Sequence, residues 1–226
     1  MVKNLLNLFF PKVCEACQNV LTDNEVVICL KCRHQLPVTN FHFDHPEAVK
    51  KVLYGRVKLE NATALLHFSK KSSVQQMLHN LKYRGHENIS GFLGRWLGSE
   101  LKSLEAYNNV DVVIPVPLYK IKQRQRGYNQ VDLFGREIAK HLDIEFNNSV
   151  LVKTKATSTK VFQSRLKRWA EDSSTFSLTE NQSLKGKHIL LVDDLITTGA
   201  TIEACASVLH SIDNIKLSLA TMAIAD

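Results

Sequence analysis

Two adjacent carboxylates, Asp193 and Asp194, stand at the end of a short apolar run in the stretch HILLVDDLITTGAT (188–201). An apolar run of this length, followed by polar residues, predicts a buried strand. In sheets whose strands alternate with helices, ligands bind beyond the carboxyl ends of the strands. The two acids therefore stand where carboxylate oxygens can accept hydrogen bonds from the hydroxyl groups of a sugar.

The residues after the acids suit a phosphate group. Residues 195–201 form a turn into the helix predicted for 199–212, and backbone N–H groups at a helix N-terminus bind phosphate. Gly199 allows the backbone to approach a ligand closely, and hydroxyl donors come from Thr197, Thr198 and Thr201. A ribose 5-phosphate requires this combination of sugar-binding acids and a phosphate-binding turn.

Three other interpretations of this stretch exist. The magnesium-binding strand of a P-loop NTPase would require the motif G-x-x-x-x-G-K-[ST], which the sequence lacks. The acidic pocket of a response-regulator receiver closes the first strand of its domain, whereas only 33 residues follow Asp193. The third is a strand-to-helix turn with capping acids. Two acids, three threonines and a glycine at this spacing favour the ligand-binding interpretation.

Four of the five cysteines form two C-x2-C pairs separated by eleven residues: Cys14, Cys17, Cys29 and Cys32. Each pair places two thiolates on one tight turn, and two such turns close a tetrahedral zinc site. Cysteine would fill all four positions, so the Zn²⁺ would be structural, with no open position for catalysis. The alternatives are two disulfides or a redox pair, and disulfides are rare in a reducing compartment. Cys205 fits a buried thiol in a helix.

The composition favours a globular protein with anionic partners. The chain has 226 residues, of which 44% are hydrophobic, which suits one sizeable α/β domain plus a small module. A net charge of +7 and a pI of about 9.1 favour phosphate-bearing partners. No stretch approaches the ~18 apolar residues that a membrane helix needs. Asn4, Asn7 and Pro11 interrupt the N-terminal apolar run, which argues against a signal peptide. We therefore expect a cytoplasmic protein without membrane insertion.

The remaining pattern predicts strands that alternate with helices. The predicted strands are 62–68, 110–117, 150–152, 188–194 and 216–225. The predicted helices are 72–85, 89–107, 128–142 and 199–212. This alternation predicts a mostly parallel sheet with flanking helices. Residues 1–40 would form the cysteine module, and residues 41–226 the α/β domain.

Positive charge gathers in two segments, 119–140 and 153–172, which each hold six basic and two acidic side chains. One such run alone is usually a solvated loop. Two runs near a predicted phosphate site favour an anion-binding face. Together with the flanking aromatic residues Tyr128 and Trp169 and the family resemblance described below, this charge leads us to expect weak binding of single-stranded DNA. The residues expected to bind it are Lys120, Lys122, Arg124 and Arg126, with help from Arg165 and Arg168.

The residues LLVDD followed by TTGAT resemble the ribose-phosphate signature of type I phosphoribosyltransferases. Members of that family use phosphoribosyl pyrophosphate (PRPP) with Mg²⁺. The resemblance implies that Asp193 and Asp194 are the catalytic acids, which hold the ribose 2′- and 3′-hydroxyls. It also implies that the 5′-phosphate is wrapped by Thr197, Thr198, Gly199, Ala200 and Thr201.

Two further segments, IPVPLYKIKQRQRGYNQ (114–130) and LKYRG (81–85), are similar to segments of the ComF family. These competence-related proteins carry an N-terminal zinc ribbon before a phosphoribosyltransferase domain. The resemblance implies that pyrophosphate meets the loop after the first core strand. Prolines in this loop cannot donate an N–H, so basic side chains would supply the charge. The PRPP-binding residues implied here are Val116, Pro117, Lys120, Arg124 and Arg126. The segment 157–169 follows the family less regularly, and Lys160 and Glu171 stand where Gln and Asn are expected.

The sequence therefore predicts an α/β protein with a type I phosphoribosyltransferase fold, preceded by a small four-cysteine zinc ribbon. We expect the two aspartates to face solvent at the end of their strand. Two function classes follow. One is Mg²⁺-dependent transfer of the 5-phosphoribosyl group to an unknown acceptor, with release of pyrophosphate. The other is an accessory protein of DNA uptake that binds single-stranded DNA and other competence proteins, with a regulatory or relict PRPP site.

Overall fold

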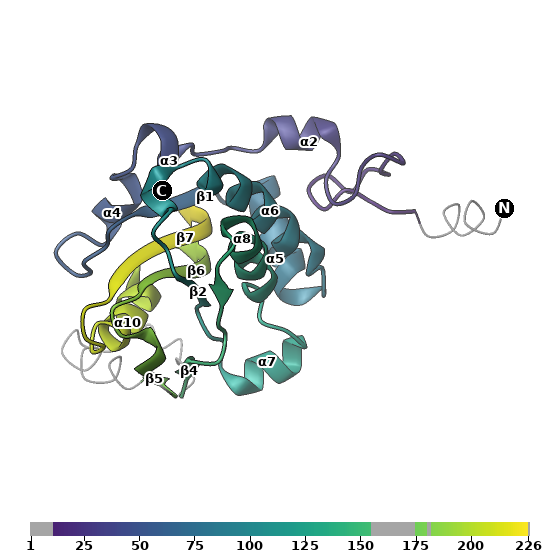
Figure 1. Cartoon of the computed structure of the whole chain (residues 1–226). Helices are drawn as coiled ribbons and strands as arrows, with labels where there is room; N and C mark the ends of the chain where they lie inside the picture. The colour runs from purple at the N-terminus through teal and green to yellow at the C-terminus, as the bar shows by residue number, and fades with distance from the viewer. Residues whose placement is uncertain (1–10, 155–174, 180–181, 226) are drawn as a thin grey trace.

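A five-stranded sheet forms the centre of the molecule in the computed structural model, which describes residues 11–154, 175–179 and 182–225 (Figure 1). The strand order is β1-β7-β6-β2-β3, and every neighbouring pair is parallel. The strands are β1 (Ala62–Phe68), β2 (Val112–Pro115), β3 (Glu145–Phe146), β6 (His188–Ile196) and β7 (Lys216–Ala225). The prediction of a mostly parallel sheet is confirmed.

A second, smaller sheet is not hydrogen-bonded to the main one. It pairs β4 (Leu151–Lys153) with β5 (Phe176–Leu178) in antiparallel fashion. The strand predicted near residues 150–152 lies in this antiparallel pair rather than in the parallel sheet.

The central strands are apolar because helices cover both faces of the sheet. Leu190 and Val192 of β6 point into one core, and Ile189 and Leu191 point into the other. The first core lies under the helices α5 (Ser73–Tyr83), α6 (Asn88–Lys102) and α8 (Asp132–Leu142). The second lies under α4 (Ala48–Val52) and α10 (Ala200–Leu209).

Glycines in α6 let α8 pack closely against it. A Cβ atom at Gly94 would lie 2.6 Å from the carbonyl oxygen of Phe134, and one at Gly98 would lie 3.1 Å from the Cα of Ile138. This close approach explains why glycines occur in a helix, where they cost about 1 kcal/mol each relative to alanine.

Several element bounds differ from the sequence prediction. The helix predicted for 89–107 ends at Lys102, and a 3-10 turn (Glu105–Tyr107) follows it. The helix predicted for 128–142 begins at Asp132. The segment after β2 contains a helix, α7 (Lys120–Arg126), which ends at Gly127 in the left-handed conformation. The unassigned residues 41–60 contain α3 (Phe41–Asp44) and α4, and η2 (Gln182–Leu184) precedes β6.

The cysteine segment packs onto the first core. Its buried residues Val27, Ile28 and Leu36 belong to the same apolar cluster as α5 and α6. The chain then runs antiparallel to β1, where the Thr39 N–H donates to the Leu65 carbonyl at 3.0 Å. A domain boundary near residue 40 stays a prediction.

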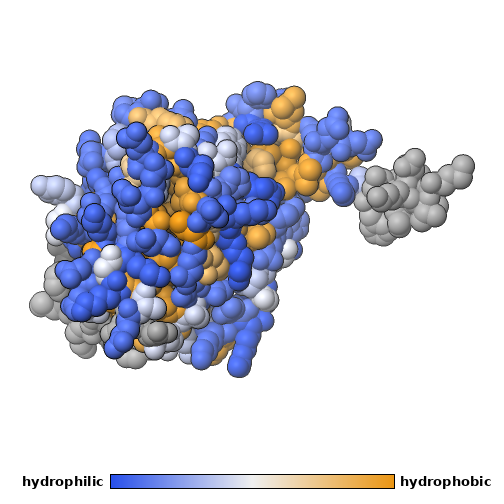
Figure 2. All heavy atoms as spheres, viewed as in Figure 1, coloured by the Kyte–Doolittle hydropathy of each residue, from blue (hydrophilic) through white to orange (hydrophobic). Residues whose placement is uncertain are grey.

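Apolar side chains gather on the surface of the cysteine segment in Figure 2. The exposed ones there are Val20, Val26 and Leu30. Among residues 11–154, 175–179 and 182–225, no helix has the length and apolar character to cross a membrane.

Candidate functional site

The two aspartates lie near the carboxyl end of β6, between β7 and β2. Asp193 and Asp194 are only 8% and 5% exposed, so the expectation that they face solvent is wrong. The strand continues past them to Ile196, and side chains from α5 and from the segment before α8 contact Asp194. They are buried polar groups with protein partners.

Both carboxylate oxygens of Asp194 accept hydrogen bonds from the protein. Lys82 Nζ lies 2.7 Å from Oδ1, and Gln130 Nε2 donates to Oδ2 at 2.6 Å. Arg126 Nη1 in turn donates to Gln130 Oε1. Two segments far apart in sequence thus meet at one acid.

Asp193 lies in a less favourable electrostatic environment. Its Oδ1 accepts the backbone N–H of Asp194 at 2.8 Å. Burial and the neighbouring Asp194 charge raise the pKa of Asp193 to about 7, from an ordinary value of 3.8. A carboxyl whose pKa lies near neutrality changes charge readily when a ligand approaches.

The raised pKa predicts a pH-dependent effect of Asp193→Asn on stability. A group whose folded-state pKa is raised stabilises the fold at low pH, and this contribution is lost as pH rises through about 7. The Asp193→Asn change removes this charge, so it should raise the melting temperature more at about pH 8 than at about pH 5. The increase at pH 8 should exceed the increase at pH 5 by on the order of 5 °C. Thermal melts of both proteins at the two pH values would measure this. The exposed Asp213→Asn is the matched control, and an Asp193→Asn effect that is equal at both pH values would contradict the assignment.

The turn after β6 has the geometry of an anion-binding loop. Thr197, Thr198, Ala200 and Thr201 are exposed, whereas Gly199 is buried. Gly199 has a φ of +78° and occupies the N-cap position of α10. Glycine has no side chain there to accept hydrogen bonds from the first N–H groups of the helix, so these groups suit an external anion.

Contacts from the residues just after α4 hold this turn in place. A Cβ at Gly199 would lie 2.4 Å from Leu53 Cδ2, and the positive φ also favours glycine at this position. Arg56 Nη2 donates to the Thr198 carbonyl at 2.7 Å, and its Nη1 donates to Glu203 Oε2 of α10 at 2.8 Å. Arg56 was not among the predicted site residues, because residues 41–60 carry no interpretable pattern.

The segment after β2 differs from the loop that we expected. The Val116 N–H donates to the Val192 carbonyl at 2.9 Å, and the Val116 carbonyl accepts from Asn129 Nδ2 at 3.1 Å. Because these two groups bond within the protein, and Pro117 lacks an N–H, neither residue offers an obvious donor for pyrophosphate. Lys120, Lys122 and Arg124 are exposed on α7, and Arg126 is half-buried.

A cavity of about 260 Å³ lies where α7 meets the end of α5. Its lining residues are Lys82, Tyr83, Gly85, Lys122, Gln125 and Arg126. The Arg126 guanidinium lies 5.6 Å from the centre of the Tyr83 ring. The lining contains three cations and no acid, so the cavity suits an anion.

The segment LKYRG (81–85) was predicted to matter only from its resemblance to the ComF family. In the structure its Lys82 forms an ion pair with Asp194. Arg165, Arg168 and the segment 157–169 lie outside the described residues.

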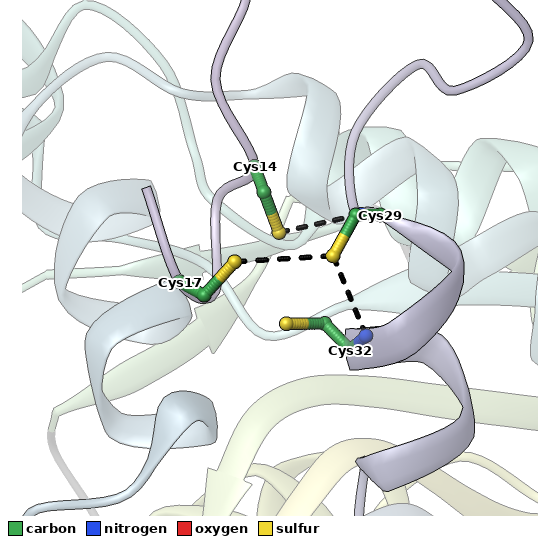
Figure 3. Close-up of side chains that lie close together, drawn as sticks. All are labelled: Cys14, Cys17, Cys29 and Cys32. Atoms are coloured by element: carbon green, nitrogen blue, oxygen red, sulfur yellow. Dashed lines mark hydrogen bonds between the residues drawn. The ribbon is translucent and has the colours of Figure 1, made fainter. Parts of the chain in front are cut away.

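The four predicted metal ligands come together beside α2 (Leu30–Gln35) (Figure 3). The sulfur atoms of Cys14, Cys17, Cys29 and Cys32 all lie within 4.8 Å of one another, and those of Cys17 and Cys29 are 3.8 Å apart. Tetrahedral zinc with Zn–S bonds of about 2.3 Å requires sulfur atoms about 3.8 Å apart. All four thiols are free. The donor set therefore fits Zn²⁺. The alternative of two disulfides does not agree with four free thiols at these distances.

Hydrogen bonds inside the cluster favour the thiolate form of Cys14, whereas burial raises the pKa of Cys32. Burial alone would raise the pKa of Cys14, but backbone N–H groups of Cys29, Cys17 and Ala16 lower it to about 7. The Cys29 N–H donates to Cys14 Sγ at 3.3 Å. Such N–H···S bonds hold the ligands in orientation, as hydrogen bonds to the ligands do at other metal sites.

The cysteine segment also connects to the helix that carries Lys82. Glu15, between the first two cysteines, lies with its Oε2 2.5 Å from His86 Nδ1 and 3.4 Å from Asn80 Nδ2 of α5. The cluster thus supports the end of α5 from outside the parallel sheet.

Comparison with known proteins agrees with this architecture. Residues 133–223 match the family model of the phosphoribosyl transferase domain. The chain is 26% identical over 200 residues to the DNA utilization protein YhgH of Shigella flexneri, covering 87% of this chain and 83% of the relative. It is 25% identical over 194 residues to the competence protein ComFC of Bacillus subtilis, covering 79% and 76%. It is 35% identical over 103 residues to competence protein F of Haemophilus influenzae, covering 45% of each.

The family match covers α8, β6, the threonine turn, α10 and most of β7. The longest alignments to the competence and DNA utilization proteins extend well beyond it, and the cysteine cluster fits the N-terminal module expected from the sequence. The chain is therefore a homologue of these DNA utilization and competence proteins, with a four-cysteine cluster ahead of a phosphoribosyl transferase domain.

Proposed function

We propose that the protein binds Mg²⁺-PRPP and transfers its 5-phosphoribosyl group to an acceptor, with release of pyrophosphate. The observation that carries this proposal is the pairing of Asp193 and Asp194 with the exposed threonine turn of residues 197–201 at one strand end. The acids would accept hydrogen bonds from the ribose 2′- and 3′-hydroxyls. The turn would hold the 5′-phosphate with its N–H and hydroxyl donors.

The chemistry follows from these positions. The bond between the anomeric carbon and the pyrophosphate oxygen breaks, and pyrophosphate leaves with the bonding electrons. The acceptor then donates an electron pair to the anomeric carbon and loses a proton. The carboxylates of Asp193 and Asp194 would stabilise the positive charge that develops on the sugar. Mg²⁺ bound to the substrate would neutralise charge on the leaving group.

An acceptor screen tests this transferase function. The purified chain would be incubated with Mg²⁺-PRPP and pools of nucleobases, amines and ammonia, and pyrophosphate release would be measured. Acceptor-dependent release is the expected result. Binding of PRPP without any release would favour the second candidate below, in which the site is regulatory.

The second candidate is an accessory role in DNA uptake, with single-stranded DNA and competence proteins as partners. The observation that favours it is α7, which exposes Lys120, Lys122 and Arg124 within two turns. Four free, clustered cysteines also fit a reducing compartment. Under both candidate functions we therefore propose a cytoplasmic location and a structural Zn²⁺.

Salt dependence distinguishes this surface from non-specific attraction. For single strands, the log–log slope of affinity against salt changes by about 0.7 per phosphate contact. Replacing Lys120 and Arg124 together by Gln should flatten the slope by about 1.4 and weaken binding at ~50 mM salt. Fluorescence anisotropy with a labelled oligonucleotide at several salt concentrations measures both the affinity and its slope. The matched control replaces Lys58 and Lys216, which are exposed at the amino-terminal ends of β1 and β7. Equal effects of both pairs would exclude α7 as the binding surface.

A further inference from the structure

The ribose site is closed by the protein's own cation in the free chain. Lys82 Nζ binds Asp194 Oδ1 at 2.7 Å, and Gln130 Nε2 binds Oδ2 at 2.6 Å. The Lys82 side chain is 23% exposed and the Asp194 side chain 7%, so the ion pair is largely shielded from solvent. A ribose hydroxyl that approaches Asp194 must therefore compete with an ammonium group for the same carboxylate.

Lys82 also borders the basic cavity. It lines that cavity together with Lys122 and Arg126, which come from α7. Arg126 is tied to the same acid through Gln130, because its guanidinium donates to Gln130 Oε1. A lysine side chain has several rotatable bonds and three N–H donors. Lys82 can thus exchange Asp194 for an anion in the cavity by changing its side-chain rotamers.

We propose that Lys82 is a positioning residue that changes partners when PRPP binds. In the free protein it neutralises Asp194. When the ribose hydroxyls take Asp194, Lys82 turns into the cavity and binds the pyrophosphate of the same PRPP molecule. This inference rests on the proposed function, since it assumes that the ribose lies at Asp193 and Asp194.

This exchange makes Lys82 a determinant of specificity. Ribose 5-phosphate has the hydroxyls and the 5′-phosphate but no pyrophosphate. Its binding would displace Lys82 from Asp194 without giving the ammonium group a new anion, and a poorly solvated cation without a partner is costly. PRPP supplies that anion. The affinity for PRPP should therefore exceed the affinity for ribose 5-phosphate by a larger factor than the pyrophosphate contacts alone would give.

Replacing Lys82 by Met tests the exchange through two ligands. Calorimetric titration of the Lys82→Met protein should show PRPP affinity about tenfold lower, because one charged hydrogen-bond donor to pyrophosphate is lost. Affinity for ribose 5-phosphate should rise, since no cation competes for Asp194, and an unchanged affinity would contradict the exchange. Lys122→Met is the matched control. It removes a cavity cation that does not pair with Asp194, so it should weaken PRPP and leave ribose 5-phosphate unchanged.

Other outcomes separate the inference from the proposed function. If Lys82→Met weakens both ligands by the same factor, Lys82 only supports the fold of the site and the exchange is wrong. If the wild-type chain binds neither ligand, the proposed function itself fails. Lys82→Arg keeps the charge and should retain most of the preference for PRPP, which keeps the test decisive if the Met variant does not fold.

Discussion

Asp194→Asn should weaken binding of Mg²⁺-PRPP by about 100-fold. A carboxylate that accepts two hydrogen bonds from ribose hydroxyls contributes about 1.5 kcal/mol or more for each, and every 1.4 kcal/mol corresponds to tenfold in affinity. The amide also turns one acceptor oxygen into a donor. Isothermal titration calorimetry of the wild-type and variant proteins measures the loss.

The matched control for this experiment is Asp213→Asn, an exposed acid that pairs only with Lys185 among the described residues. It should leave PRPP affinity unchanged. Circular dichroism must show that Asp194→Asn remains folded, because the change leaves Lys82 without its carboxylate. A folded Asp194→Asn protein that binds PRPP as tightly as the wild type would place the ribose elsewhere.

Cys29→Ser should release the metal and unfold the cysteine segment. The binding free energy of structural Zn²⁺ in small modules is about 10–16 kcal/mol, and it is coupled to folding. Cys29 is central to the cluster, because its backbone N–H donates to Cys14 Sγ and its own sulfur accepts the N–H of Cys32 at 3.5 Å. Metal analysis should find about one zinc per wild-type chain and much less in the variant. Hydrogen exchange should accelerate throughout residues 12–36.

The control for the cysteine experiment is Cys205→Ala. Cys205 is buried in the second core, away from the cluster, so the variant should keep its zinc. Because Glu15 contacts His86 and Asn80, loss of zinc should also speed exchange at the end of α5. A wild-type protein that contains no zinc, or a Cys29→Ser protein that retains it, would contradict the structural metal site.

Local sequence patterns predicted the parts of the site that are formed by consecutive residues. The acids, the threonines and Gly199 lie within one strand–turn–helix unit, where periodicity and turn chemistry identify the elements. The two C-x2-C pairs likewise specify a cluster through their spacing alone. The parallel sheet followed from the alternation of strands with helices.

Contacts between distant segments could not be predicted in this way. Lys82 reaches Asp194 across 112 residues, and Arg56 reaches Thr198 across 142. Nothing in the local pattern of either segment reports such a partner. The burial of Asp194 was missed for the same reason, since Lys82 and Gln130 contact it from distant segments. Helix α7 was missed because it follows two prolines and has no buried residue to give it apolar periodicity.

Hydrogen–deuterium exchange with and without Mg²⁺-PRPP tests the location of the site most directly. The proposed site predicts slower exchange of the amides of residues 195–202, where the N–H groups of the turn and the first turn of α10 would bond the 5′-phosphate. It predicts little change at the amino-terminal ends of β6 and β7, at the opposite edge of the sheet. Saturating PRPP that leaves residues 195–202 unprotected, or that protects a different surface instead, would contradict the assignment of this turn and its two aspartates as the phosphoribosyl site.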